Sequence, residues 1–234
     1  MCRCTLGRWW YRRWWYVVGN QYYGASSHAR GITNTCKEVH SRMLCEMPIS
    51  SKDFFGRVPD IEKLAEILHS RDPGQKGAVI WGLGGFGKSR LALQYINLYE
   101  GRYSVILWVN AGTLETAVDS YCQAALELVN RGSLLSTPSG DHRDVALIHR
   151  WLSRPQGEYT WLLVIDSIDD LESFDCRRLV PSCNHGNIIV TSANSQTSTH
   201  LGFQDLELGS IDENAGSDML LSRLSSAEAH LDCR

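Results

Sequence analysis

The residues most able to do chemistry in this sequence form one glycine-rich run from Gly82 to Ser89, with the pattern Gly-x-x-x-x-Gly-Lys-Ser. Its glycines let the backbone curl so that successive N–H groups point at phosphate oxygens. They are Gly82, Gly84, Gly85 and Gly87. Lys88 is expected to reach the β- and γ-phosphates of a nucleotide, and the Ser89 hydroxyl to hold Mg²⁺. The run therefore predicts a site for a nucleoside phosphate.

Two regular elements must position this loop. An apolar run at 77–81 predicts a short buried strand before it, and a helical pattern at 88–99 follows it. The N-terminus of that helix adds positive potential where phosphate would lie. Strand, glycine loop and helix together are the context that the P-loop signature requires.

A metal bound at a P-loop also needs a carboxylate. The apolar strand at 161–165 ends in Asp166, which matches a Walker B pattern in which the Asp holds Mg²⁺ through water. An Asp that merely begins a turn after a strand is the competing interpretation. Asp169 and Asp170 follow, and either could orient a water molecule or cap the next helix.

The rest of the chain alternates strands with helices, which predicts a parallel sheet covered on both faces. Further strands are expected at 103–109 and 187–191, with a weaker candidate at 205–208. Further helices are expected at 60–70, 114–129 (capped by Thr113), 142–152, and from a cap at Asp212 to 224. The Gly, Ser, Thr and Pro residues of 132–140 predict a loop.

Bulk properties narrow the class of protein. The chain has 234 residues, enough for one α/β domain with extensions, and its net charge of −3 gives no overall attraction to nucleic acid or anionic membrane. No stretch approaches 18 uncharged apolar residues, so no transmembrane segment is expected. The eight cysteines are irregularly spaced. This favours free thiols in a reducing, cytoplasmic compartment over disulfides or a metal site near Cys176, Cys183 and His185.

Residues 1–47 differ in composition from the rest. Residues 1–37 contain no Asp or Glu, and half of the tryptophans lie at positions 9, 10, 14 and 15. A basic aromatic patch for anionic lipid or nucleic acid is one interpretation. The preferred interpretation is a poorly ordered leader, because no periodicity is visible.

Several ordered motifs resemble the NB-ARC domain of STAND P-loop NTPases, in particular that of fungal NOD-like receptor proteins. The resemblance covers about 54–224. The matching segments are Phe54-Phe55-Gly56-Arg57, the loop and helix at 79–92, the strand 105–111, the Walker B segment 162–170, the sensor strand 188–192 and the exit 206–215.

The resemblance implies a P-loop NTPase three-layer α/β sandwich, with a parallel five-stranded sheet in the order 5-1-4-3-2. It implies a nucleotide-binding domain at 48–225, followed by a tail at 226–234. It also implies ATP or ADP with Mg²⁺ as ligands, and a signalling switch that associates with itself or with other NB-ARC proteins. By motif, Phe55, Gly56 and Arg57 would meet the adenine, and Lys88, Asp166 and Asp169 would be the catalytic candidates.

Three positions depart from the family pattern. Val58 replaces a Glu, Ser167 stands where a second acid often follows the Walker B Asp, and Ala193 stands where an Arg usually reads the γ-phosphate. Loss of that Arg charge is expected to cost several kcal/mol in the transition state. The helical lid domains that follow in the family are also not found before Arg234.

Two functions from different classes follow. The first is an ADP/ATP-binding switch with slow hydrolysis. The second is a truncated, non-hydrolysing module that associates with full-length relatives. A small-molecule kinase would need substrate-binding arginines and a lid that the sequence does not show.

Overall fold

The computed structural model describes residues 42–44, 54–135, 137–154, 160–217 and 220–221. Within these residues, six parallel strands form one sheet in the order β1-β3-β4-β5-β2-β6. The strands are β1 (Arg42–Leu44), β2 (Lys76–Trp81), β3 (Tyr103–Asn110), β4 (Thr160–Asp166), β5 (Asn187–Ser192) and β6 (Gln204–Glu207). The predicted five-stranded order is confirmed by the run from β6 to β3. The short edge strand β1, inside the segment expected to be a leader, was not predicted.

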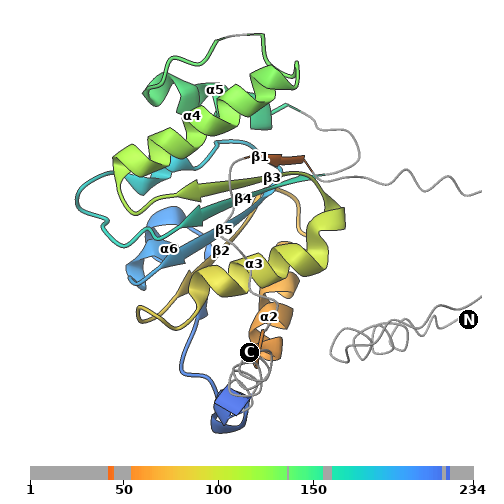
Figure 1. Cartoon of the computed structure of the whole chain (residues 1–234), viewed down its shortest axis with the longest axis vertical. Coiled ribbons are helices and arrows are strands. Elements are labelled where there is room, and N and C mark those ends of the chain that lie inside the picture. The colour runs from red at the N-terminus through yellow and green to blue at the C-terminus, as the bar shows by residue number, and fades with distance from the viewer. Residues whose placement is uncertain (1–41, 45–53, 136, 155–159, 218–219, 222–234) are drawn as a thin grey trace, which may run out of the picture. The chain divides into compact units, whose positions relative to one another are not determined.

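Helices cover both faces of the sheet (Figure 1). They are α2 (Val58–Leu68), α3 (Lys88–Tyr99), α4 (Leu114–Asn130), α5 (His142–Leu152) and α6 (Gln196–Leu201), with 3₁₀ turns at Glu100–Arg102 and Cys176–Leu179. In Figure 1, α4 and α5 lie on one face, and α2 and α3 on the other. Residues 213–217 and 220–221 are also helical.

The apolar strands build a core on each side because successive side chains point to opposite faces. In β3, Val105 and Leu107 belong to the core under α4 and α5, whereas Ile106 and Trp108 belong to the core under α2 and α3. All four are buried. Each fully buried side chain of this size contributes about 1.5–3 kcal/mol, so burial on both faces stabilises the sheet that carries the glycine loop.

Polar residues mark the helix ends much as expected. Thr113 accepts a hydrogen bond from the N–H of Thr116 and forms a capping box at α4. Asp212 accepts bonds from the N–H groups of Asn214 and Ala215, as a cap should. Helix α2 begins two residues before the predicted start, because Arg57 adopts a left-handed conformation and Pro59 fits the first turn. The predicted helix end at 224 lies outside the described residues, as do residues 1–41 and 226–234.

Sequence reasoning missed α6. It has six residues, all but the last of them polar or small, so neither length nor periodicity indicated a helix. Among the described residues, no helix combines the length and the apolar character needed to cross a membrane.

Candidate functional site

The glycine loop lies at the carboxyl edge of the sheet, between the end of β2 and the start of α3. Gly82 is held between its neighbours: its N–H donates to Ser192 O at 3.2 Å, and a Cβ there would come within 2.4 Å of Leu208 O. Any other residue would therefore push away Leu208, which directly follows β6. Gly87, at φ 89°, occupies the N-cap of α3 in a left-handed conformation that favours glycine. These glycines shape the loop that the sequence predicted.

Lys88 folds back over this loop. Its Nζ donates to the carbonyl oxygens of Gly82 at 2.8 Å and Leu83 at 3.1 Å. The ammonium group is thus at the mouth of the loop, next to the N-terminus of α3, where positive charge and helix dipole act on the same small volume.

The P-loop and the Walker B strand meet through one hydrogen bond. Ser89 Oγ donates to Asp166 Oδ1 at 2.6 Å, although the two residues are 77 positions apart. Thr191 Oγ1 donates to the same Oδ1 at 2.5 Å and accepts the N–H of Ser167 at 2.9 Å. The structure therefore brings together the predicted Ser89 and Asp166. It adds Thr191, which the sequence motifs placed only in a sensor strand.

These groups fit the requirements of Mg²⁺, which prefers oxygen ligands. Because the Ser89 hydroxyl donates its hydrogen bond to Asp166, its lone pairs are left for a cation, and the carboxylate can act through water. Bound there, Mg²⁺ would neutralise charge on the phosphates. The ligands here would include hydroxyls, because nowhere in the described part of the chain is a group of three or more His, Cys, Asp or Glu side chains placed to hold a metal ion.

Asp169 and Asp170 have different surroundings. Asp169 Oδ1 accepts the N–H of Ala193 at 2.6 Å, so it lies beside the position where the NB-ARC resemblance leads one to expect an Arg. Asp170 accepts the N–H groups of Glu172 and Ser173 and the Ser173 hydroxyl, and these bonds, the hydroxyl's first, lower its pKa. Asp170 thus stabilises a local turn. Both aspartates border a pocket of about 370 Å³ that Asn194 and His200 also line.

Two of the three positions that depart from the NB-ARC pattern, Ser167 and Ala193, lie at this same edge, directly after β4 and β5. Ser167 adopts φ 69°, uncommon for a residue with a side chain, as the chain turns back so that the Ile168 N–H reaches Thr191 O at 2.9 Å. Ala193 offers a ligand no side-chain donor.

The segment before α2 also reaches the P-loop. Arg57 Nη2 donates to Phe86 O at 3.1 Å and to Gly209 O at 2.7 Å, and Nη1 pairs with Asp60 at 3.4 Å. The structure thus places Arg57 beside the loop, with its side chain bonded to carbonyls of the protein itself, and Gly56 beside Ala215 and Ile211. Phe55 is half-buried. That these residues meet adenine stays a prediction.

Comparisons with known proteins agree on the fold. The chain is similar to the Orc1 protein of Aeropyrum pernix, solved in complex with DNA, with a TM-score of 0.50 and 20% identity over 74% of this chain and 50% of that one. It is similar to Cdc6p from Pyrobaculum aerophilum, with a TM-score of 0.51 and 16% identity over 76% and 52%. A STAND protein with a tetratricopeptide repeat sensor from Pyrococcus horikoshii matches with a TM-score of 0.46 and 19% identity over 69% and 24%.

The chain spans about half the length of the first two proteins. No protein-family model matches the sequence, and neither does any curated protein. At such identities the likeness concerns the fold. Together with the sheet order and the strand–loop–helix at its carboxyl edge, it shows that this domain has the fold of a P-loop NTPase.

Proposed function

We propose that the domain binds ADP and ATP with Mg²⁺ and works as a signalling switch of the STAND type. The observation that carries the proposal is the 2.6 Å hydrogen bond from Ser89 to Asp166, which joins the two motifs that a metal–phosphate complex needs. Lys88 would neutralise the β- and γ-phosphates, the loop N–H groups would bind their oxygens, and Ser89 with Asp166 would hold the metal. The family motifs around them support the finer NB-ARC assignment.

Hydrolysis is proposed to be slow. Asp169 is the candidate for orienting the attacking water, and its Oδ1 already accepts the Ala193 N–H. Ala193 supplies no positive side chain for the developing charge on the phosphate. We therefore expect nucleotide to be held longer than it is turned over, which suits a switch better than a fast ATPase.

The second candidate is a non-hydrolysing interaction module that associates with other NB-ARC proteins. The lack of a side-chain donor at Ala193 favours it. The Orc1 protein was solved with DNA, but the net charge of −3 here gives no reason to propose DNA as a partner.

Calorimetric titration of ATP and ADP, each with Mg²⁺, tests the proposal. We expect binding of both nucleotides by the natural chain, and a loss of about a hundredfold or more in Lys88→Ala, because an ammonium group that meets two phosphates is removed. The matched control is Lys63→Ala, which removes an exposed lysine from α2. Equal ATP affinity in Lys88→Ala and Lys63→Ala would refute the site. If neither the natural chain nor the variants bound nucleotide, the non-hydrolysing interaction module would be the better proposal.

Turnover is tested separately with Ala193→Arg. Restoring a positive charge at the sensor position should raise the rate of ATP hydrolysis by about tenfold or more. Phosphate release over hours, with the natural chain alongside, measures it. If the two rates agree, Ala193 does not limit hydrolysis.

A further inference from the structure

Arg57 lies at the junction of three segments that are far apart in the sequence. Its side chain is only 9% exposed. One nitrogen, Nη2, joins Phe86 O in the P-loop to Gly209 O after β6, which are 29 and 152 positions away. The side chain is therefore largely removed from solvent and bonded to protein on both sides, rather than extended toward a ligand.

The contact with Phe86 has a consequence for phosphate binding. The Phe86 carbonyl and the Gly87 N–H belong to one planar trans peptide and point in opposite directions. Because Arg57 holds the carbonyl on its own side, it turns the Gly87 N–H toward the other side. Gly87 is the N-cap of α3, so this N–H belongs to the group that a phosphate at the helix terminus would meet.

The contact with Gly209 leads to the chain that leaves the sheet. Leu208 N–H donates to Trp81 O at 2.7 Å, which fixes the end of β6 beside the P-loop strand. Three residues after Gly209, Asp212 caps the helical segment 213–217. This segment packs closely on the turn before Arg57, since a Cβ at Gly56 would come within 2.9 Å of Ala215 Cβ.

We propose that Arg57 is a positioning residue that couples phosphate binding in the P-loop to the order of residues 209–217. The proposal rests on the nucleotide binding proposed above and identifies how that site is connected to residues 209–217, the segment that follows β6. A phosphate that fixes the Phe86–Gly87 peptide strengthens the hydrogen bonds from Arg57 to the carbonyl oxygens of Phe86 and Gly209. By linkage, an ordered exit segment then strengthens phosphate binding by the same factor.

The test uses two probes, ATP with Mg²⁺ and inorganic tripolyphosphate, on the full chain. A residue that positions the loop affects both probes, whereas a residue that reads adenine affects ATP alone. We expect Arg57→Ala to weaken both by about tenfold, the usual effect of losing a charge-assisted hydrogen bond. Arg57→Lys should recover part of the loss, since one ammonium keeps the charge but lacks the planar fork. The matched control is Arg131→Ala, at the end of α4 and paired with Glu127.

Hydrogen exchange gives a second readout, in the natural chain and in Arg57→Ala. ADP should slow exchange of the backbone amides of 209–217 in the natural chain, and at saturating ADP this protection should disappear in Arg57→Ala. If Arg57→Ala bound ATP more weakly but tripolyphosphate with unchanged affinity, the proposal would be overturned. It would also be overturned if ADP did not change hydrogen exchange at 209–217 in the natural chain. If the natural chain binds neither ATP nor tripolyphosphate, the proposed function itself fails.

Discussion

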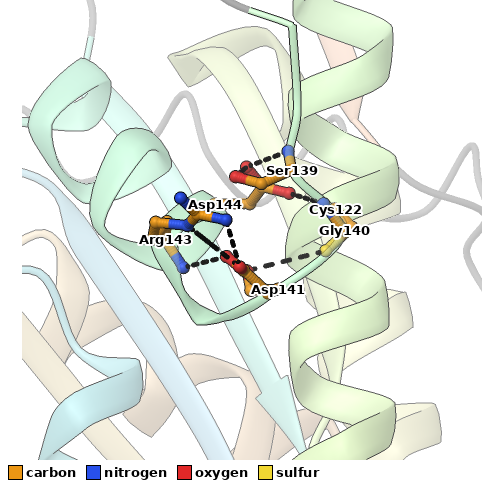
Figure 2. Close-up of polar contacts among 6 residues, drawn as sticks. All are labelled: Cys122, Ser139, Gly140, Asp141, Arg143 and Asp144. Atoms are coloured by element: carbon orange, nitrogen blue, oxygen red, sulfur yellow. Dashed lines mark hydrogen bonds and ion pairs between the residues drawn. The ribbon is translucent and has the colours of Figure 1, made fainter.

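Two aspartates, Asp166 in the candidate site and Asp144 in the first turn of α5, show how differently one side chain can be used. Asp144 is 1% exposed, and both of its oxygens accept bonds from its own loop. Oδ1 accepts the N–H of Ser139 at 3.0 Å and its hydroxyl at 3.2 Å, and Oδ2 accepts the Gly140 N–H at 2.7 Å (Figure 2). At Asp166, both hydroxyl partners donate to Oδ1.

The electrostatics of the Asp144 loop agree with a structural role. Burial alone would raise the pKa of Asp144, but the N–H groups of Ser139 and Gly140 outweigh it and hold the pKa below its ordinary value. Burial first, and then Asp144, raise the pKa of the nearby Cys122 thiol to about 12. Asp144 is therefore committed to a loop, whereas the second oxygen of Asp166 takes no hydrogen bond from the described residues. A carboxylate that can bind a ligand thus differs from a structural one in having an oxygen that the protein leaves without a hydrogen bond.

The largest expected difference concerns metal-dependent binding. Asp166→Asn removes the charge that attracts Mg²⁺ and should weaken ATP binding in the presence of Mg²⁺ by about tenfold to a hundredfold. The same variant should lose less than about 1 kcal/mol of unfolding free energy, because an amide still accepts bonds from hydroxyls. Calorimetry with and without Mg²⁺, alongside urea unfolding, measures both. If Asp166→Asn kept its Mg²⁺-dependent ATP binding but lost several kcal/mol of unfolding free energy, Asp166 would be the structural carboxylate and not the metal-binding one.

The mirror-image variant is Asp144→Asn. Its amide would set an N–H₂ group against the N–H of Ser139 or Gly140, and we expect a loss of about 1–3 kcal/mol in unfolding free energy with no change in ATP affinity. Asp141→Asn is the matched control. Asp141 caps α5 from the same turn but is only half-buried, with its side chain 42% exposed, and Asn caps as well as Asp. Similar urea midpoints for the two variants would show that Asp144 is not the residue that holds the loop.

The sequence could predict those parts of the site that local pattern determines. Gly82 to Ser89 and Asp166 carry their own signatures, and parallel strands bring their carboxyl ends to one edge. The bond from Thr191 to Asp166 could not be predicted, because it depends on the register of β5 against β4. The bond from Arg57 to Gly209 spans 152 positions and leaves no local trace. In the sequence, Asp144 is indistinguishable from any acidic residue in the first turn of a helix, so its burial could not be predicted.

The smallest effect we predict is the pH dependence of the Asp144 contribution. Its folded pKa lies below the unfolded value of about 3.9, so the unfolded chain binds the proton more tightly. The contribution is therefore complete above that unfolded value and is lost as the pH falls through the folded pKa. The difference in unfolding free energy between the natural chain and Asp144→Asn should be constant from pH 7 to 5 and shrink toward pH 3. Taking this difference removes most of the effect of the other carboxylates, including Asp141 beside Arg143. A difference that grew toward pH 3 would mean that the protonated form of Asp144 is the one the loop prefers.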